Sequence, residues 1–199
     1  MSVITLLSDF GADSHYLASF RGALLQSEID LPFIEITSRV EPFDIVEAAY
    51  LSSMVYNDFS KNSIHILATN VVATSFKGHL AAFFNGHFFI APDNGILTLI
   101  FGEQFSNYYR IPTDQYVQKI QKVYLPFISK LVDANFQLDQ VAEKTDKIDT
   151  KTRINPVKDD KELRGTVLFV DHFGNAYTNV SKAEFDQFVS DGSYSISVG

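Results

Sequence analysis

The chain of 199 residues contains no cysteine. Disulfide bonds, thiolate zinc sites and cysteine nucleophiles are therefore excluded. The chain also has no apolar run long enough to span a bilayer. Its N-terminus has no basic segment before the first apolar run, which a signal peptide would carry. These absences predict a cytoplasmic protein that is not held in a membrane.

Basic residues are scarce as well, with 16 Lys and Arg against 24 Asp and Glu and a net charge of −8. Because affinity for nucleic acid depends on clustered Lys and Arg, we expect no nucleic-acid partner. The five histidines show no spacing typical of metal ligands. Glycine-rich phosphate loops and Ser-His-Asp signatures are absent too. We therefore expect neither a metal ion nor a bound cofactor.

The chain does have a large apolar fraction, 46% against 20% charged residues, which suits a packed core. Short apolar runs alternate with segments of helical periodicity. The runs predict strands at 2–8, 33–36, 63–69, 79–84 and 87–91, and the periodic segments predict helices at about 15–27, 44–56 and 123–134. Alternation of strands and helices indicates a layered α/β domain.

Two local signals support this prediction. Asp44 is followed three residues later by Glu47 and preceded by Phe43, which is the pattern of a capping box with a hydrophobic staple. The pair Asn85-Gly86 separates two apolar runs and predicts a two-residue hairpin turn. The first signal marks a helix start and the second fixes the pairing of two neighbouring strands.

The composition changes after residue 139, where charged residues crowd together without a periodic apolar face. We therefore predict an α/β N-terminal domain over 1–140 and a charged linker over 141–163. The remainder, 164–199, is expected to be a partial β-rich C-terminal domain. Within it we predict a strand at 165–170, a short helix capped by Ser181 with Glu184, and a strand at 193–198.

Three motifs place a carboxylate or amide beside a glycine at the end of a predicted strand. They are Ser8-Asp9-Phe10-Gly11, Pro92-Asp93-Asn94-Gly95, and the segment 171–179, which reads Asp-His-Phe-Gly-Asn-Ala-Tyr-Thr-Asn. An α/β protein builds its ligand site at such strand ends. Asp and Asn beside Gly are also common turn formers, so a purely structural role is open for each motif taken alone.

The order of these motifs resembles that in the S-adenosylmethionine (SAM) hydroxide adenosyltransferases, or SAM hydrolases, which are relatives of the SAM-dependent fluorinase and chlorinase enzymes. Further matching segments are Tyr16, Arg21-Gly22, Ile36-Thr37, 41–45 and 63–65. The resemblance implies a layered α/β N-terminal domain, a small β-rich C-terminal domain and a homotrimer with the site between subunits. It also implies hydrolysis of SAM to adenosine and methionine, by in-line attack of water on the ribose 5′ carbon.

The resemblance also assigns ligand-binding roles to individual residues. Asp9 matches the carboxylate that binds the two ribose hydroxyls, and a carboxylate can accept both hydrogen bonds. Phe173 matches the aromatic side chain that stacks on adenine, and Asn175 the amide that pairs with the adenine edge. Asp171 would face the amino group of methionine. Ser14, or its neighbour Asp13, matches a further polar contact to methionine.

The catalytic positions depart from the family pattern. The family orients and deprotonates the attacking water with an Asp, an Arg and a His; here Asn70 and Lys77 stand at the first two positions. The stretch that begins at Lys119 replaces the segment with the histidine. Because Asn cannot accept a proton near neutral pH, and general-base help is worth about 10²–10⁴ in rate, hydrolysis is expected to be weak.

Three functions therefore remain open from the sequence. The first is weak SAM hydrolysis with Asn70 and Lys77 near the water. The second is binding of SAM or adenosine without turnover, as a sensor or scaffold. The third is another reaction at the same pocket, with Lys77 or Lys119 stabilising a different nucleophile.

Overall fold

The computed structural model describes residues 1–71, 78–102, 104–113, 119–189 and 192–197. The chain forms two compact units, Met1–Thr152 (unit 1) and Arg153–Gly199 (unit 2). Each unit is described by itself. None of the helices in these described ranges is long and apolar enough to cross a bilayer.

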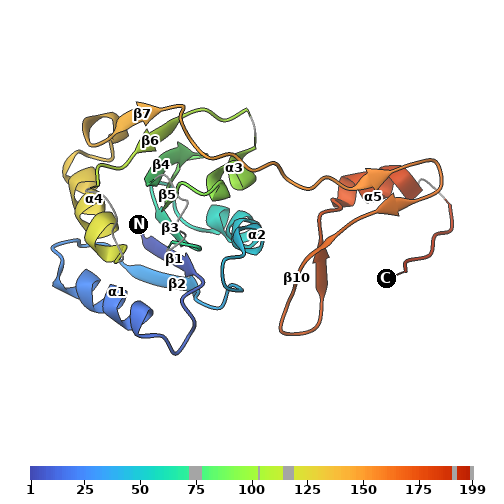
Figure 1. Ribbon diagram of the computed structural model, residues 1–199, viewed down its shortest axis with the longest axis horizontal. Coiled ribbons are helices and arrows are strands. Elements are labelled where there is room, and N and C mark those ends of the chain that lie inside the picture. The colour runs from blue at the N-terminus through green and yellow to red at the C-terminus, as the bar shows by residue number, and fades with distance from the viewer. Residues whose placement is uncertain (72–77, 103, 114–118, 190–191, 198–199) are drawn as a thin grey trace. The chain divides into compact units, whose positions relative to one another are not determined.

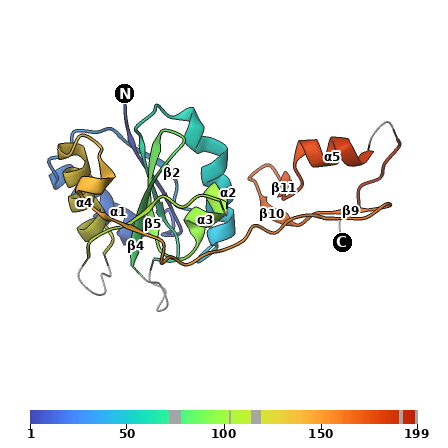
Figure 2. The ribbon, with the colours of Figure 1, turned by 90° about the horizontal axis from the view of Figure 1, so that it is seen from above.

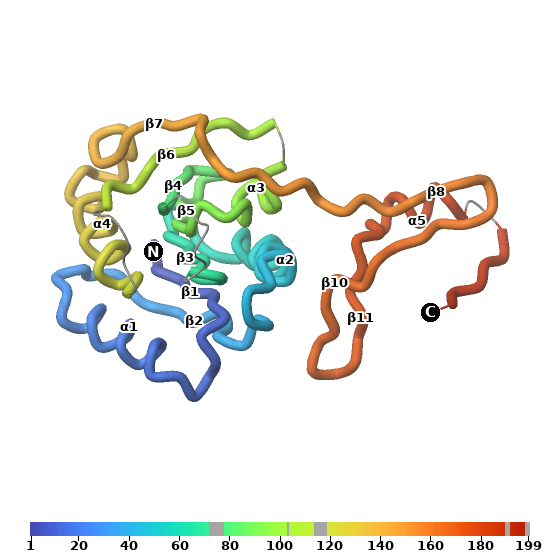
Figure 3. Tube along the Cα trace, viewed as in Figure 1, coloured from blue at the N-terminus to red at the C-terminus, as the bar shows by residue number. Residues whose placement is uncertain are grey.

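Unit 1 is built on a seven-stranded mixed sheet with the order β2-β1-β3-β5-β4-β6-β7. The strands β1, β2, β3 and β5 run parallel, whereas β4, β6 and β7 are antiparallel additions at one side. Figure 3 shows β7 and β2 at the two edges of the sheet. The strand bounds are β1 Ile4–Ser8, β2 Phe33–Thr37, β3 Ile64–Ala68, β4 His79–Phe84, β5 His87–Pro92, β6 Tyr108–Arg110 and β7 Glu143–Thr145.

Helices cover both faces of this sheet (Figure 2). On one face α1 (His15–Gln26) and α4 (Gln121–Asp133) pack against alternate residues of β1 and β3. On the other face α2 (Ile45–Val55) and α3 (Ile96–Phe101) cover the remaining residues of the same strands. Because β1 and β3 are buried on both faces, they read as continuous apolar runs rather than as an alternating pattern.

The helix starts follow from local side-chain chemistry. Ser14 caps α1 by accepting a hydrogen bond from the Tyr16 amide at 3.1 Å. Asp44 caps α2, since its Oδ1 accepts from the amides of Val46 and Glu47 at 2.9 Å each. The predicted capping box is modified, because the Glu47 carboxylate accepts from the Glu41 amide instead of from the N-cap residue.

Unit 2 consists of two small hairpins and one helix. The first hairpin pairs β8 (Val157–Lys158) with β9 (Leu163–Arg164), and the second pairs β10 (Val167–Val170) with β11 (Ala176–Thr178). The helix is α5, Lys182–Val189, and it begins with the complete capping box of Ser181 and Glu184. No residue of unit 2 that the structure describes is buried.

The layered α/β fold class predicted from the sequence is confirmed. Some details differ. The helix α3 was not predicted, and the predicted strand at 193–198 is wrong, since the described residues 193–197 form no strand. Residues 143–145, inside the segment predicted as a linker, pair with β6 as the edge strand β7. Two short 3-10 turns, Tyr56–Asp58 and Leu138–Gln140, complete unit 1.

Candidate functional site

Three polar residues of unit 1, of which Asp9 was predicted to bind the ligand and Asn70 to lie near the reacting water, follow the carboxyl ends of adjacent parallel strands. Asp9 follows β1, Asn70 follows β3 and Asn94 follows β5. The chain places β2 on one side of β1 and β3 on the other, so β1 and β3 flank the point where the strand order reverses. In open α/β sheets, ligands bind in the crevice at such a point.

The Asp9 carboxylate is held by the backbone. Its Oδ2 accepts hydrogen bonds from the amides of Phe43 and Asn70, each at 2.9 Å. No described residue donates to Oδ1. Because each carboxylate oxygen has two lone pairs, Oδ1 keeps its full accepting capacity for a ligand while Oδ2 fixes the orientation of the group.

Both donors to Asp9 have a left-handed backbone. Phe43 has a φ of 70° and Asn70 has a φ of 56°. This conformation costs roughly 1–2 kcal/mol for residues other than glycine, with asparagine the most tolerant. Both strained residues donate their amides to the same carboxylate oxygen. The backbone strain is therefore located at the candidate site.

A hollow of about 230 Å³ opens beside Asp9. Most of its lining residues are apolar or aromatic, and the lining residues with polar side-chain groups are Asp9, Tyr16 and Gln121. The lining residues are Asp9, Phe10, Tyr16, Pro42, Phe43, Val71, Ile120 and Gln121. The volume lies below the 300–1,000 Å³ typical of small-molecule pockets, so the hollow suits one part of a nucleoside-sized ligand.

A second hollow, of about 330 Å³, runs along α4. Lys122 and Lys130 flank it, and Pro126 lies between them on the helix. None of its lining residues is acidic. Its lining includes neither Asp9 nor Asn70, and we therefore place the candidate site at the first hollow.

The other residues predicted for unit 1 have different placements. Ser14 is the N-cap of α1, and the amide that it accepts belongs to Tyr16 of the hollow. Asn70 acts through its backbone amide, and its side chain makes no hydrogen bond to any described residue. Lys119 is exposed and immediately precedes Ile120 and Gln121 of the hollow. Lys77 lies outside the described residues.

The predicted residues of unit 2 come together in the turn between β10 and β11. The Asp171 Oδ1 accepts from the amides of Phe173 and Asn175, at 2.9 and 2.8 Å. Its Oδ2 accepts from the side-chain amide of Asn175 at 2.8 Å, and this hydrogen bond is the first of several that lower the pKa of Asp171. The turn leaves Phe173 87% exposed, so one face of an aromatic ring is open to a ligand.

Sequence reasoning missed Phe43 and Gln121 as parts of the site. Phe43 was interpreted only as a hydrophobic staple beside the helix start, yet its amide holds Asp9 and its ring lines the hollow. Gln121 reaches the hollow from α4, where its Nε2 donates to Ser19 Oγ of α1 at 2.8 Å. A left-handed turn and a contact between two helices leave no signal in a single sequence.

Among the described residues, no three His, Asp or Glu side chains gather closely enough to hold a metal ion. The chemistry of the hollow thus consists of one carboxylate, one phenol and one amide in apolar surroundings. Such a set can recognise hydroxyl groups and cover an apolar or aromatic body. It contains no histidine that could serve as a general base near neutral pH.

Comparisons with known proteins show the family to which the fold belongs. The family model described as the SAM hydroxide adenosyltransferase N-terminal domain matches residues 4–158. An (R)-S-adenosyl-L-methionine hydrolase of Methanocaldococcus jannaschii is 24% identical over 190 residues, which cover 92% of this chain and 69% of that protein. A fluorinase of Nocardia brasiliensis is 24% identical over 221 residues, covering 93% and 73%.

Solved structures show the same fold. An uncharacterized conserved protein from Thermotoga maritima superposes with a TM-score of 0.77 at 25% identity, covering 94% of this chain and 73% of the other. A conserved hypothetical protein from Thermus thermophilus has a TM-score of 0.68 at 19% identity, with coverages of 90% and 73%.

Proposed function

The chain belongs to the SAM hydroxide adenosyltransferase family, and from this membership we propose that it binds SAM beside Asp9 and hydrolyses it weakly to adenosine and methionine. The relatives named as a SAM hydrolase and a fluorinase support a function that involves SAM. Water, rather than a halide, is proposed as the nucleophile in keeping with the name of the family.

The observation that carries the proposal is the state of the Asp9 carboxylate. One oxygen is fixed by two backbone amides and the other has no donor among the described residues. A carboxylate oriented in this way can accept hydrogen bonds from the vicinal hydroxyls of a ribose. The apolar and aromatic walls beside it would cover the sugar and exclude water.

The proposed reaction is an in-line displacement at the ribose 5′ carbon. The water oxygen forms a bond to this carbon while the carbon–sulfur bond breaks, and the bonding electrons leave with sulfur. The sulfonium thereby becomes the neutral thioether of methionine, and the attacking water releases one proton to bulk solvent. Because the leaving group is already activated by its positive charge, positioning of the reactants supplies much of the rate.

Weak turnover follows from the residues near the proposed water position. Asn70 stands where the family has an aspartate, and an amide side chain does not accept a proton near neutral pH. General-base assistance typically contributes about 10²–10⁴ in rate, which this site would lack. Lys77, the other proposed catalytic position, lies outside the described residues, and its part in the reaction belongs to the proposal alone.

Unit 2 is proposed to contribute the contacts to adenine and methionine. Phe173 offers an exposed ring for stacking, and Asn175 an amide beside it. Asp171, which orders this turn, would also attract the methionine amino group, and Ser14 would add a polar contact. In the homotrimer that the family resemblance implies, these residues would face the Asp9 hollow of a neighbouring subunit. Sedimentation of the full chain as three copies would agree with this assembly.

A second function is binding of SAM or adenosine without turnover. Two residues favour it: Asp9 can still bind the ligand, whereas Asn70 beside it cannot accept the proton of the water. A protein with this site would report the ligand rather than consume it. Product formation separates the two functions.

The test is incubation of the full chain with SAM, with chromatography of adenosine and methionine and a parallel calorimetric titration. Asp9→Asn keeps the shape of the side chain and removes its charge. Asp30→Asn changes an exposed carboxylate before β2, at the amino-terminal end of the parallel strands and so at the end opposite to Asp9. We expect adenosine from the parent chain and from Asp30→Asn, and at least tenfold weaker binding by Asp9→Asn.

Binding without adenosine would select the non-catalytic function. Equal affinities of the parent chain and Asp9→Asn would disprove the ribose assignment and with it the proposed site.

A further inference from the structure

The peptide group between Thr69 and Asn70 is held at both of its ends. Its carbonyl, on Thr69, accepts a hydrogen bond from the side-chain Nδ2 of Asn94 at 3.0 Å. Its amide, on Asn70, donates to Asp9 Oδ2 at 2.9 Å. Since a peptide group is planar and rigid, fixing the carbonyl also fixes the direction of the amide. Asn94 and Asp9 are thereby linked through a single planar group.

This peptide group lies beyond the ordered pairing of the sheet. The ladder between β1 and β3 ends at Ser8 and Ala68, so neither strand fixes the peptide that follows. The Thr69 hydroxyl is buried and has no hydrogen-bond partner among the described residues, so it does not anchor the turn. The left-handed φ of Asn70 adds a strained residue directly after it. The side-chain amide of Asn94 is therefore the group that fixes the carbonyl of this peptide.

Asn94 is itself kept in place. It is only 9% exposed, and its Oδ1 accepts from the Ile96 amide at 3.2 Å at the start of α3. The preceding residue, Asp93, is fully buried and accepts from Arg110 at 2.8 Å and from the Asp149 amide at 2.7 Å. The Asn94 side chain therefore has a fixed position from which it donates to Thr69.

We propose that Asn94 is a positioning residue, which orients the Thr69–Asn70 peptide so that its amide holds Asp9 in the ligand-accepting orientation. A donor on the carbonyl also polarises the peptide and makes its amide a stronger donor to the carboxylate. The consequence for the ligand rests on the proposed function, whereas the effect on Asp9 itself does not.

Phe43 supplies an internal reference for this proposal. Its amide donates to the same Asp9 oxygen at 2.9 Å, and it reaches that oxygen from the turn before α2. Asn94 makes no described hydrogen bond to that turn. Loss of the Asn94 donor should therefore change the Asn70 amide and leave the Phe43 amide as it is. A general loosening of the domain would change both.

Two variants remove the donor in different ways. Asn94→Ser is shorter and neutral, and it can still accept from the Ile96 amide. Asn94→Asp has the same shape and keeps the acceptor for Ile96, but when ionised it has no donor for Thr69. Only Asn94→Asp adds a negative charge. An effect that appears in both variants is therefore caused by the loss of the donor to Thr69 and not by the added charge.

The measurement is a pH titration of backbone amide protons by NMR in the full chain. In the parent protein the amide protons of Phe43 and Asn70 should follow the ionisation of Asp9 with one shared midpoint, and Asp9→Asn should abolish both shifts. In both Asn94 variants we expect the shift of Asn70 to fall at least twofold, with that of Phe43 retained. Unchanged shifts at both amides, or equal loss at both, would overturn the proposal.

A ligand titration with SAM adds a second readout. We expect about tenfold weaker binding by Asn94→Ser than by the parent chain, because the carboxylate then keeps only one of the two amides that orient it. If the parent chain does not bind SAM at all, the proposed function fails while the amide titration still decides the role of Asn94. Full affinity in Asn94→Ser would show that the orientation of Asp9 does not depend on this residue.

Discussion

At the scale of single residues, unit 1 contains a buried line of hydrogen-bonded side chains that the proposed site does not use. Thr5 Oγ1 lies 2.8 Å from His65 Nδ1, and His65 Nε2 lies 3.2 Å from His87 Nδ1. His87 Nε2 lies 3.3 Å from the Lys61 ammonium. Because an ammonium only donates, His87 Nε2 must be the acceptor, and we infer that both rings are neutral. His87 Nδ1 then donates to His65 Nε2, and His65 Nδ1 donates to Thr5 Oγ1.

Burial is the main reason why these rings stay neutral. It lowers the pKa of His65 to about 3, with a further contribution from His87, and it lowers the pKa of His79 to about 4. The pKa of His87 is also lowered, by burial first and by Lys61 second. In the unfolded chain the same groups titrate near their ordinary value of 6.5. The unfolded state therefore binds more protons below that pH, and the stability contribution present above it is lost as the pH falls toward 3 or 4.

We predict a free energy of unfolding that decreases from pH 6.5 toward pH 4, with His65 as one cause. His65→Asn keeps a donor for Thr5 but does not titrate. It should lower the free energy of unfolding at pH 7.5 by about 1–3 kcal/mol, because the buried hydrogen bond between His65 and His87 is lost. It should also make the pH dependence of this free energy shallower, by up to about 1.4 kcal/mol per pH unit. Urea unfolding at several pH values measures both quantities. His172→Gln, at an exposed position, is the control, and an unchanged slope in His65→Asn would contradict the assignment.

The residue scale also shows the limit of sequence reasoning about the site. Asp9 was identified because its motif, at the end of a predicted strand, matches the family pattern, and the side chain lines the hollow. Whether it binds ribose stays a prediction. Asn70 was considered for its side chain, whereas the structure uses its backbone amide. The direction of one amide depends on tertiary contacts such as that with Asn94, and the identity of Asn70 does not encode it.

At the scale of elements, strong local patterns were predicted well and short pairings were not. β4 and β5 were predicted as apolar runs, and the hairpin between them was predicted from the turn chemistry of Asn85-Gly86. β6 and β7 are three residues each and were missed, because a strand of that length is specified by its neighbour rather than by its own sequence. In α1 the buried face contains Leu17 and Phe20, whereas Tyr16 is half-exposed.

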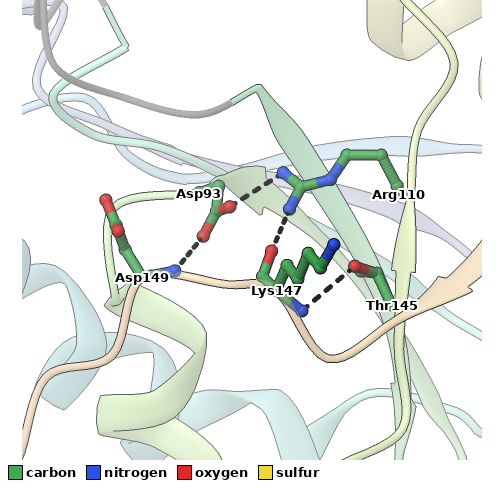
Figure 4. A network of polar contacts seen from close by, with 5 residues as sticks. All are labelled: Asp93, Arg110, Thr145, Lys147 and Asp149. Atoms are coloured by element: carbon green, nitrogen blue, oxygen red, sulfur yellow. Dashed lines mark hydrogen bonds and ion pairs between the residues drawn. The ribbon is translucent and has the colours of Figure 1, made fainter.

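The segment after β7 is an element-scale case of order that comes from contacts. Figure 4 shows Asp93 between Arg110 and the Asp149 amide, and Arg110 also donates to the Lys147 carbonyl. Two residues on, the Lys151 amide donates to Thr98 Oγ1 at 2.8 Å. The sequence of this segment is charged and has no apolar periodicity, yet these hydrogen bonds attach it to β6 and to α3.

We predict that Asp93→Ala releases this segment to proteolysis. Trypsin cleaves after Lys147 and Lys151, and its access requires a backbone that can leave the fold. The variant leaves Arg110 without its buried carboxylate, at a cost of about 2–3 kcal/mol; this lies below the 3–5 of fully buried pairs because Arg110 keeps contact with water. Cleavage at the two lysines, followed by mass spectrometry, should accelerate at least tenfold. Cleavage after Lys161, an exposed site of unit 2, is the control and should keep its rate.

At the scale of the whole molecule, apolar burial is confined to unit 1. Both hydrophobic clusters belong to this unit, one on each face of the sheet. The described residues of unit 2 include none that is buried, and several of its apolar side chains are largely exposed, among them Val157, Phe173 and Ile196. Domains of about 60 residues already bury only a marginal share of their surface, and unit 2, Arg153–Gly199, is shorter. Unit 2 therefore depends on hairpin and capping hydrogen bonds, which contribute little without a core.

A fragment of residues 1–152 is therefore predicted to fold by itself. It keeps the seven-stranded sheet, both clusters and the bonds of Asp93, so urea should unfold it in one cooperative transition with a midpoint close to that of the full chain. A peptide of residues 153–199 should show no cooperative transition by circular dichroism. The amide protons of Phe43 and Asn70 in the fragment should still titrate with Asp9, because both donors lie within it. An unfolded fragment would mean that unit 2 supplies stability through contacts made in the assembled protein, and the exposed apolar residues of unit 2 would be the first to substitute.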